Sequence, residues 1–541
     1  MCYTQNRFKA LLSACVMSLI AIAGWSQSLT WLGVLPDGIE SVALGVSADG
    51  AVVVGSVYTA SSPPWRAFRW TASGGMQDLG DLGGGESWAY GVSADGAVVV
   101  GWAQNAAGQW RAFRWTASGG MQDLGTLGSN QSFAYGVSAN GAVVVGWAKN
   151  AAGYQRAFRW QNGVMLALGT LGGYESEAYG VSADGSVVVG WAYNSAGRRR
   201  AFRWTAAGGM QDLGTLPGSN ESVARGVSAD GSVVVGWAWS DVPGYGRAFR
   251  WTAAGGMQDL GTLGGDWSGA TAVSADGSVV VGVADNAEGW SRAFRWTEAG
   301  GMQDLGTLPG DCCSSAWGVS ADGSVVVGYA QNAAGQWRAF RWTAAGGMQD
   351  LGTLGGDRSE ALGVSADGSV VVGWAYNAAG GSRAFRWTAA SGMEDLNLTY
   401  AHLLTDGSEL WAADAISPDG RYIAGWGYNA ATGRWEAFLL DTQGVGVEEG
   451  SGAARVRLRL LPQPAHERVV LELEAAEAAR RVTIVVSDVL GRVVAEPLRG
   501  AVLPPGVHRV ELDVRAWAIG QYTVVLRTEA GSAAVPLVVV R

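Results

Sequence analysis

Few residues of this chain have the types and spacing that catalysis needs. Its 541 residues include three histidines, His402, His466 and His508, too few and too dispersed for a Ser-His-Asp triad or a histidine metal cluster. Aspartates are abundant, and paired carboxylates can hydrolyse glycosides, but nearly all of them recur at equivalent positions, as turn residues do. We expect no enzymatic activity, no metal and no cofactor, and a glycan-active enzyme is the weakest alternative.

Two adjacent thiols, Cys312 and Cys313, are the remaining chemically reactive pair. They stand where related segments of the chain read Gly-Gly-Asp or Gly-Ser-Asn, so one interpretation is two small residues in a longer connection. In an oxidising compartment the alternative is a disulfide between neighbouring residues. Adjacent cysteines with no histidine nearby lack the spacing of a metal site.

Exposed aromatic rings and arginines can stack on sugars or anchor a protein partner. Such residues gather in those connections that differ from one copy of an internal repeat to the next. We predict a ligand-binding face from them; the alternative is that the rings pad the edges of the fold. The predicted residues are Trp88, Trp110, Phe133, Tyr154, Tyr174, Arg199, Tyr245, Trp267, Trp290 and Trp337.

The repeat that must position these residues is about 45 residues long and occurs nine times. Each copy carries an Asp-Gly or Asn-Gly turn, from Asp49 to Asp419, among four short runs rich in Val, Trp and Phe. Four antiparallel strands per repeat predict an all-β fold, a β-propeller of about nine four-stranded blades.

The two ends of the repeat region predict how the ring closes. The segment from Leu29 aligns with the fourth strand of a blade, and the last repeat stops after its third strand at Leu440. We therefore expect the N-terminal strand to complete the ninth blade.

A recurring Arg and Asp predict a further stabilising contact within the blades. With a four-residue turn at Ala72 to Gly75, the Arg of RAFRW faces the Asp of MQDLG across the hairpin, where opposite charges attract. At the closing blade the two positions are Leu439 and Trp31, so both are apolar where closure would join them. The predicted structural pairs include Arg69 with Asp78, Arg114 with Asp123, and Arg203 with Asp212.

Composition and the flanking segments indicate export. The net charge is −10 and lysine occurs only at Lys9 and Lys149, which argues against a nucleic-acid partner. Residues 1–27 read as a secretory signal peptide, 28–441 as the propeller, 442–454 as a linker, and 455–541 as a small C-terminal β-sandwich.

The C-terminal segment resembles the type IX secretion sorting domain. The resemblance rests on Leu461-Pro-Gln-Pro-Ala465, the Asp-Val-Leu-Gly-Arg turn from Asp488, Gly520-Gln-Tyr522 and the terminal Arg541. The usual aromatic and Asn of the first motif are Leu461 and Gln463 here. The resemblance implies export across the outer membrane through the secretion machinery, then release or anchoring at the cell surface.

The repeats resemble the HAF family of extracellular repeats, whose short motif is Arg-Ala-Phe here, over about Leu29 to Leu440. This resemblance implies a propeller but no activity. Together, these features predict a monomeric, secreted or cell-surface binding and adhesion module for a glycan or protein. The alternative is a structural surface scaffold without a discrete site.

Overall fold

The structure is a computed structural model that describes residues 27–443, except 62, 243, 310 and 311, and several segments beyond. These segments are 456–461, 468–475, 479–488, 492–517, 520–528 and 531–539. The predicted signal peptide, up to residue 26, and most of the predicted linker lie outside the described residues. The chain divides into two compact units, with the boundary between Thr442 and residue 443.

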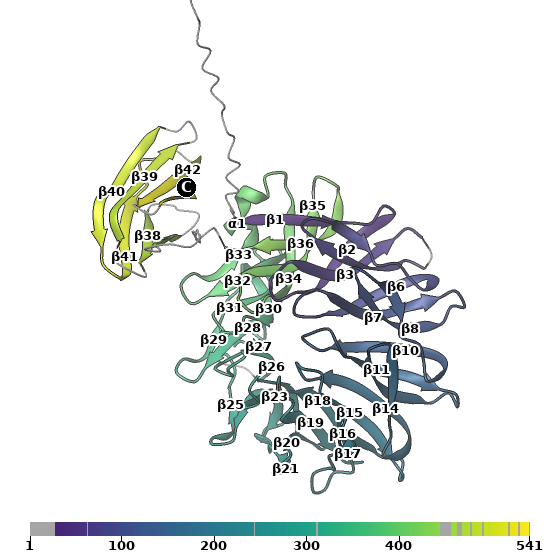
Figure 1. The fold of residues 1–541 in the computed structure, drawn as a ribbon. Coiled ribbons are helices and arrows are strands. Elements are labelled where there is room, and N and C mark those ends of the chain that lie inside the picture. Colours follow the sequence, from purple (N-terminus) through teal and green to yellow (C-terminus); the bar gives the residue numbers. More distant parts are fainter. Residues whose placement is uncertain are drawn as a thin grey trace, which may run out of the picture. The chain divides into compact units, whose positions relative to one another are not determined.

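Residues 28–442 form a β-propeller with nine four-stranded blades in the part that is described (Figure 1). The first blade consists of β2 (Gly38–Val46), β3 (Val52–Thr59), β4 (Trp65–Thr71) and β5 (Gly75–Asp78), in antiparallel order. The first strand of each blade contacts the first strands of its neighbours and is therefore innermost.

The next seven blades repeat this order. Their strands are β6 (Gly83–Val92), β7 (Val98–Asn105), β8 (Trp110–Thr116), β9 (Gly120–Asp123); β10 (Gly128–Val137), β11 (Val144–Asn150), β12 (Gln155–Gln161), β13 (Val164–Gly169); β14 (Gly172–Val181), β15 (Val187–Asn194), β16 (Arg199–Thr205), β17 (Gly209–Asp212); β18 (Glu221–Val227), β19 (Val233–Trp239), β20 (Gly246–Thr252), β21 (Gly256–Asp259); β22 (Gly264–Val273), β23 (Val279–Asn286), β24 (Ser291–Thr297), β25 (Gly301–Asp304); β26 (Ser314–Val319), β27 (Val325–Gln331), β28 (Trp337–Thr343), β29 (Gly347–Asp350); β30 (Gly355–Val364), β31 (Val370–Asn377), β32 (Ser382–Thr388) and β33 (Gly392–Asp395).

The Asp-Gly turn joins the first two strands of a blade. In the first blade, Ser47 Oγ donates to Asp49 Oδ1 at 2.7 Å, and the amide of Ala51 donates to the same oxygen at 3.0 Å. These bonds, that from Ser47 foremost, lower the pKa of Asp49. Gly50 supplies the positive φ of 69° that a side chain would disfavour. The repeated aspartates are thus used in turns.

The hydrophobic core lies between neighbouring blades. Val99, Ala103 and Phe113 of the second blade are buried against Val52 and Val54 of the first. Val98 and Val100, on the other face of the same sheet, pack against the third blade. Both faces of a blade are therefore buried, which explains why its second strand is a continuous apolar run.

A buried serine connects each blade to the preceding one in eight of the nine described interfaces. Ser87 Oγ accepts from the amide of Ala67 at 2.9 Å and donates to the carbonyl of Gly80 at 2.7 Å. The equivalent interblade serines are Ser41, Ser132, Ser176, Ser222, Ser268, Ser314 and Ser359. One hydroxyl thus satisfies two buried backbone groups.

The ring closes as the sequence predicts. The ninth blade contains β34 (Glu409–Ile416), β35 (Tyr422–Asn429) and β36 (Arg434–Asp441), and β1 (Ser28–Gly33) completes it by pairing with β36. Ser41 accepts from the amide of Ala437 at 2.8 Å, so the interblade serine also joins the first blade to the last. This closure prediction is confirmed.

The predicted Arg–Asp pairs are wrong by one residue in register. Gly75, at a φ of 65°, pairs with Thr71, so the hairpin loop has three residues instead of four. Arg69 consequently faces Gln77, and Asp78 faces Phe68 and accepts from the amide of Gly80 at 2.7 Å. A one-residue shift moves a side chain to the other face of the sheet.

The same correction applies to the other predicted pairs. Arg114 faces Gln122, Asp123 faces Phe113, Arg203 faces Gln211, and Asp212 faces Phe202. At the closing blade, Leu439 faces Thr30 and Trp31 faces Phe438.

The RAFRW arginines lie over the RAFRW tryptophan of the next blade. The guanidinium of Arg341 is 5.2 Å from the ring centre of Trp387, and its Nε and Nη2 donate to the carbonyl of Gly368 at 3.3 and 3.2 Å. Burial lowers the pKa of Arg341. Seven such Arg–Trp stacks occur in the described ring. Their arginines are Arg69, Arg114, Arg159, Arg203, Arg250, Arg295 and Arg341. The arginines are structural, as predicted, but through a different partner.

The C-terminal unit consists of two antiparallel sheets. One contains β37 (Val456–Leu461), β38 (Arg468–Ala475) and β41 (Gly506–Asp513); the other contains β39 (Ala479–Asp488), β40 (Val493–Leu503), β42 (Gly520–Thr528) and β43 (Gly531–Val539). Leu471, Ile484 and Val524 share one buried core, as expected of a small sandwich. The Pro-Gln-Pro segment, residues 489–491 of the Gly-Arg turn and Arg541 lie outside the described residues.

In the part of the chain that the structure describes, helical structure is limited to α1 (Leu396–Thr399) and η1 (Ala401–Leu403), between the eighth and ninth blades. Within the described residues, no helix combines the length and the apolar character that crossing a membrane would require.

Candidate ligand-binding face

The connections between strands two and three, and between successive blades, lie at the same end of the blades because antiparallel strands alternate in direction. An asparagine side chain stabilises the turn between strands two and three. Asn105 Oδ1 accepts from the amides of Ala107 and Gln109, both at 3.0 Å. Equivalent bonds are made by Asn150, Asn194, Asn286, Asn332 and Asn377. The aromatic residues that follow are held by these turns.

Aromatic rings contact one another from the first blade into the third. Trp88 lies 4.6 Å from Trp65 and 6.0 Å from Trp102, measured between ring centres. Trp110 and Phe133 both contact Trp102, at 4.5 and 5.9 Å. These rings are half-buried, so they pack on one another and expose only part of their surface.

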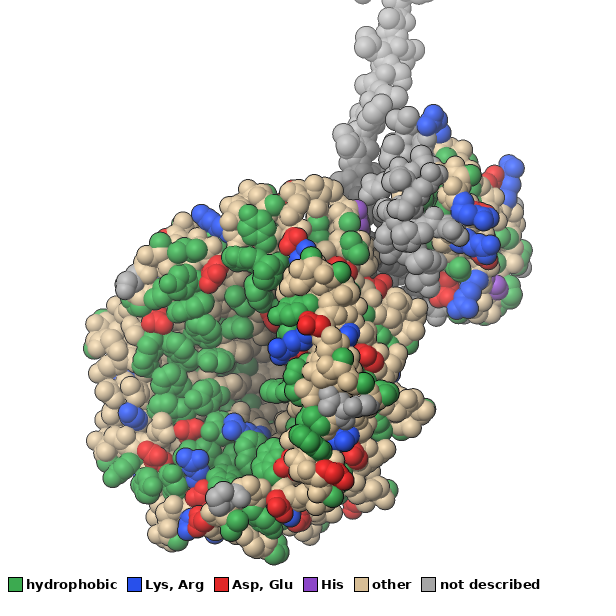
Figure 2. All heavy atoms as spheres, turned by 180° about the vertical axis from the view of Figure 1, so that it is seen from behind, with side chains coloured by type: hydrophobic (Ala, Val, Ile, Leu, Met, Phe, Trp, Pro, Cys, Tyr) green, Lys and Arg blue, Asp and Glu red, His purple; other side chains and the backbone are tan. Residues whose placement is uncertain are grey.

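A second aromatic group spans the third and fourth blades. Tyr154 and Tyr174 are each 45% exposed, and Tyr174 lies 5.8 Å from Tyr154 and 4.5 Å from Tyr193. The guanidinium of Arg199 lies over Trp191 at 4.7 Å. Figure 2 shows one face of the propeller, with a broad hydrophobic area beside a central hollow.

The other four predicted residues lie further around the ring. Tyr245 is covered by Arg247 at 4.4 Å, Trp267 forms a bridge with Gly246, and Trp337 lies 5.0 Å from Tyr329. Trp290 is 49% exposed. The structure thus brings six of the ten predicted residues into two neighbouring groups and places these four elsewhere on the face.

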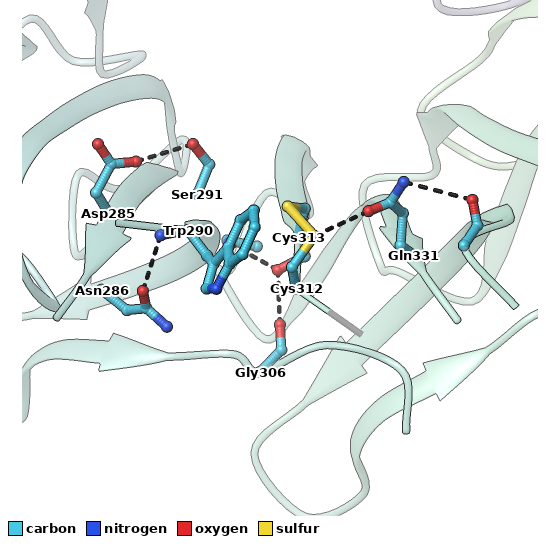
Figure 3. Close-up of a disulfide and its surroundings, with 11 residues drawn as sticks. Asp285, Asn286, Trp290, Ser291, Gly306, Cys312, Cys313 and Gln331 are labelled. Carbon is cyan, nitrogen blue, oxygen red and sulfur yellow. Dashed lines mark hydrogen bonds between the residues drawn. A yellow bond between two sulfur atoms is a disulfide. The ribbon is translucent and has the colours of Figure 1, made fainter. Parts of the chain in front are cut away.

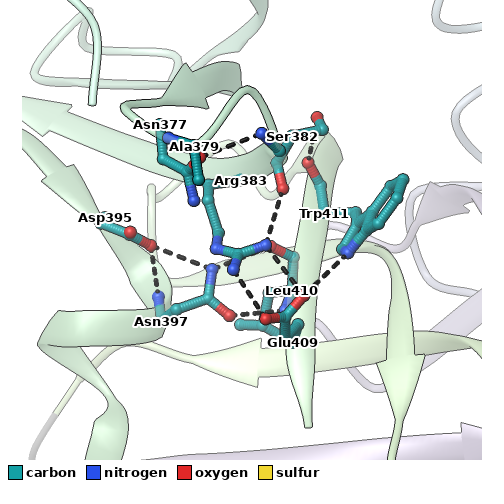
Figure 4. A network of polar contacts seen from close by, with 10 residues as sticks. Asn377, Ala379, Ser382, Arg383, Asp395, Asn397, Glu409, Leu410 and Trp411 are labelled. Atoms are coloured by element: carbon teal, nitrogen blue, oxygen red, sulfur yellow. Dashed lines mark hydrogen bonds and ion pairs between the residues drawn. The ribbon is translucent and has the colours of Figure 1, made fainter. Parts of the chain in front are cut away.

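The ninth blade carries an aromatic group that the ten predicted residues do not include. Trp411 lies 4.2 Å from Trp435 and 5.9 Å from Trp426. Glu409 accepts from both guanidinium nitrogens of Arg383, at 2.9 and 2.6 Å, and from the indole of Trp411 at 3.3 Å (Figure 4). A bidentate ion pair therefore orients this tryptophan.

Sequence reasoning missed a set of residues on the innermost strands, which we call the inner ring. In each described blade the pairing of strands one and two shifts by one residue at a β-bulge, between Ala89 and Gly91 in the second blade. The residue at the bulge is the one that varies between copies, whereas its neighbours hardly change. The inner ring consists of Leu44, Tyr90, Tyr135, Tyr179, Arg225, Thr271, Trp317, Leu362 and Asp414.

The inner ring lines the centre of the propeller. Leu44, Tyr90, Trp317 and Leu362 are 38%, 49%, 59% and 42% exposed although they lie on the innermost strands. Tyr135 contacts Tyr90 at 6.5 Å and Tyr179 at 6.1 Å, across blade boundaries. A bulge redirects one side chain of a strand. The variation before Gly-Val-Ser in the repeat was the available sequence signal.

Hydrogen bonds fix several inner-ring side chains. The indole of Trp147 donates to Tyr135 Oη at 2.9 Å, and that of Trp191 donates to Tyr179 Oη at 3.0 Å. Tyr179 donates to Glu177 Oε2 at 2.9 Å. Burial raises the pKa of Glu177 and that of Tyr179, the latter to about 12. At Asp414, burial raises the pKa to about 7, and Oδ2 is buried with no hydrogen-bond partner.

Cys312 and Cys313 form a disulfide between adjacent residues in the connection that leads into the seventh blade (Figure 3). Gln331 Oε1 lies 3.0 Å from the sulfur of Cys312. Ser314 donates to the carbonyl of Gly306 at 2.6 Å, as an interblade serine. The longer connection is therefore anchored by the same bond as its counterparts.

The described residues contain no group of three or more His, Cys, Asp and Glu side chains arranged to hold a metal. His402 is half-buried in η1, where burial lowers its pKa, and His508 Nε2 lies 2.8 Å from the carbonyl oxygen of Pro504. His466 lies outside the described residues.

A cavity of about 740 Å³ lies at the opposite end of the blades, among the Asp-Gly turns of the fifth to seventh blades. Arg250 and Asp276 contribute to its wall. Arg250 belongs to an Arg–Trp stack and Asp276 accepts from Ser274 in its turn, so both already have structural contacts.

No family model and no curated protein sequence matches the chain. Solved structures are similar at low identity. Porphyromonas gingivalis dipeptidyl peptidase 4 is 10% identical, with 82% of this chain and 65% of that chain covered and a TM-score of 0.42. A eukaryotic initiation factor is 12% identical, with 67% and 88% covered and a TM-score of 0.45. A putative TolB from Agrobacterium tumefaciens is 15% identical, with 44% and 88% covered and a TM-score of 0.29.

Proposed function

We propose that this chain is a binding module, not an enzyme, whose aromatic face binds carbohydrate outside the cell. The observation that supports it is the pair of neighbouring aromatic groups around Trp102 and Tyr174, whose rings contact one another yet remain partly exposed. Flat, partly exposed rings offer a large contact area at low entropic cost. Among them, the guanidinium of Arg199 carries hydrogen-bond donors suited to sugar hydroxyls.

Export belongs to the same proposal. The apolar N-terminal segment, the resemblance of the C-terminal segment to type IX sorting domains and the resemblance of the repeats to HAF repeats all support secretion or surface display. The C-terminal sandwich would engage the secretion machinery, and the propeller would act as a monomer.

A glycan array probed with the full chain tests the binding proposal. We expect selective signals that Trp110→Ala and Tyr154→Ser abolish, because both remove rings from the face. Val164→Ser is the matched control, since Val164 is 64% exposed on the outermost strand β13. Urea midpoints equal to that of the parent chain would show that the variants fold.

Two results would contradict this proposal. The absence of binding to any sugar on the array would favour a structural surface scaffold or a protein ligand. Signals that persist in both aromatic variants would move the site away from this face.

A further inference from the structure

Arg225 is the one member of the inner ring with a permanent positive charge. Its guanidinium lies over the rings of Tyr179 and Trp237, at 4.7 and 4.8 Å. Two aromatic contacts fix the position of the planar group without using its N–H donors. Arg225 is nevertheless an exposed residue, and no hydrogen bond or ion pair joins it to any residue that the structure describes.

This arrangement differs from that of three ion-paired arginines on the same face. Arg198 is paired with Asp241 at 2.6 Å, Arg358 with Glu360 at 2.5 Å, and Arg383 with Glu409. Their donors are occupied by carboxylates of the chain. Arg225 is instead positioned at the bulge, on the innermost strand β18, with its donors available.

Two acidic groups on the innermost strands have raised pKa values. Burial raises the pKa of Asp414, the inner ring's acidic member, to about 7, and it also raises the pKa of Glu177, which accepts from Tyr179. Asp414 also lies four blades away from Arg225 around a ring of nine. Arg225 therefore has no acidic member of the inner ring within three blades of it on either side.

A fixed guanidinium with free donors matches the two oxygens of a carboxylate or sulfate group. From Tyr179 the ring contacts continue to Tyr135 and then to Tyr90, so two exposed rings lie two and three blades from Arg225, where they could stack on neighbouring sugar units. We infer that the centre of the propeller is an acidic-sugar subsite, in which Arg225 binds the carboxylate or sulfate of a glycan held by the aromatic face. This inference rests on the proposed carbohydrate binding and names its ligand class.

The test compares sugars that differ only in their charged group, titrated calorimetrically into the full chain at physiological salt. Oligogalacturonate is paired with its methyl ester, and a heparin oligosaccharide with its desulfated, N-acetylated form. We expect at least one acidic form to bind about tenfold or more tighter than its neutralised partner, the effect of losing one charge-assisted contact. Arg225→Gln should remove that preference by weakening binding of the acidic form about tenfold more than binding of the neutral form.

Two further variants sharpen the comparison. Arg198→Gln removes the same charge from a partly exposed, ion-paired arginine of this face and should keep the preference. Arg225→Lys keeps the charge but not the planar fork and should retain only part of it. Equal urea midpoints would show that all three variants fold.

Each outcome decides between the two proposals. If acidic and neutralised sugars bind equally, and binding remains sensitive to Trp110→Ala, the acidic subsite is refuted while carbohydrate binding stands. If the preference persists in Arg225→Gln, Arg225 is not its source and the inference fails. If no sugar on the array or in the titrations binds, the carbohydrate proposal fails, and the inference fails with it.

Discussion

The Arg–Trp stack between the seventh and eighth blades allows a direct test of how the propeller is held together. Replacing Arg341 by Met keeps most of the apolar stem but removes the guanidinium above Trp387 and its two bonds to the carbonyl of Gly368. A partly desolvated cation–π contact contributes about 1 to 2 kcal/mol, and a hydrogen bond from a charged group about 1.5 to 3 kcal/mol.

The desolvation that lowers the pKa of Arg341 opposes both contributions. We therefore expect Arg341→Met to reduce the free energy of unfolding by about 2 kcal/mol. Asp350→Ala should cost about 1 kcal/mol through a separate cause, the loss of its bond to the amide of Gly352 at 2.7 Å.

Double-mutant cycles in urea, followed by tryptophan fluorescence, distinguish the partners of Arg341. The cycle of Arg341→Met with Trp387→Leu should give a coupling energy of about 1 kcal/mol, because the two groups are in contact. Leu is a suitable replacement, since Leu440 occupies this position in the ninth blade.

The cycle of Arg341→Met with Asp350→Ala should give a coupling below about 0.5 kcal/mol. A coupling above about 1 kcal/mol between Arg341 and Asp350, with none between Arg341 and Trp387, would refute the observed register and restore the cross-strand ion pair.

Two more predictions concern the ninth blade. The pKa of Asp414 is raised from 3.8 to about 7 in the folded protein, so the parent chain loses stability as the pH rises from about 4 to about 7. Asp414→Asn removes this loss. It should therefore stabilise the protein by up to about 4 kcal/mol above pH 7 and have no such effect below about pH 4. Urea midpoints between pH 4 and 8 measure this, and a constant difference across the range would contradict it. Ser41→Ala leaves the amide of Ala437 and the carbonyl of Gly33 without their hydroxyl partner, so amide hydrogen exchange in the ninth blade should accelerate. Ser87→Ala removes the same two bonds between the first and second blades and should leave the exchange of the ninth blade unchanged; acceleration there in both variants would argue against a local effect of closure.

Much of the fold could be predicted because the same pattern of strands and turns occurs in nine successive repeats. The Asp-Gly turns, the Val-rich second strand and the displaced N-terminal strand each depend on local patterns or on the order of elements, which a sequence displays directly. The register of the third and fourth strands could not be read in the same way. Whether Gly75 ends the loop or begins the strand depends on its backbone angle, and one residue moves Arg69 from Asp78 to Gln77.

The candidate site was predicted in part for the same reason. Trp88, Trp110 and Phe133 stand in segments that the sequence predicts to be variable connections. The structure places them on β6, β8 and β10, in contact with Trp102. Tyr90 and Arg225 also vary between copies of the repeat. They lie within the runs predicted as first strands, where such variation is easily attributed to a solvent-exposed position without a function. Only the bulge, seen through the shift in pairing, shows that these side chains line the centre.

The sequence by itself predicted about nine blades, the turns within them and the strand that would close the ring, because these follow from short-range patterns repeated in order. The tertiary structure decided which side chains meet between blades. Arg341 finds Trp387 and not Asp350, and nine residues far apart in the chain form one inner ring. Contacts of this kind depend on register and on the angle between neighbouring sheets, and neither is a property of any single repeat.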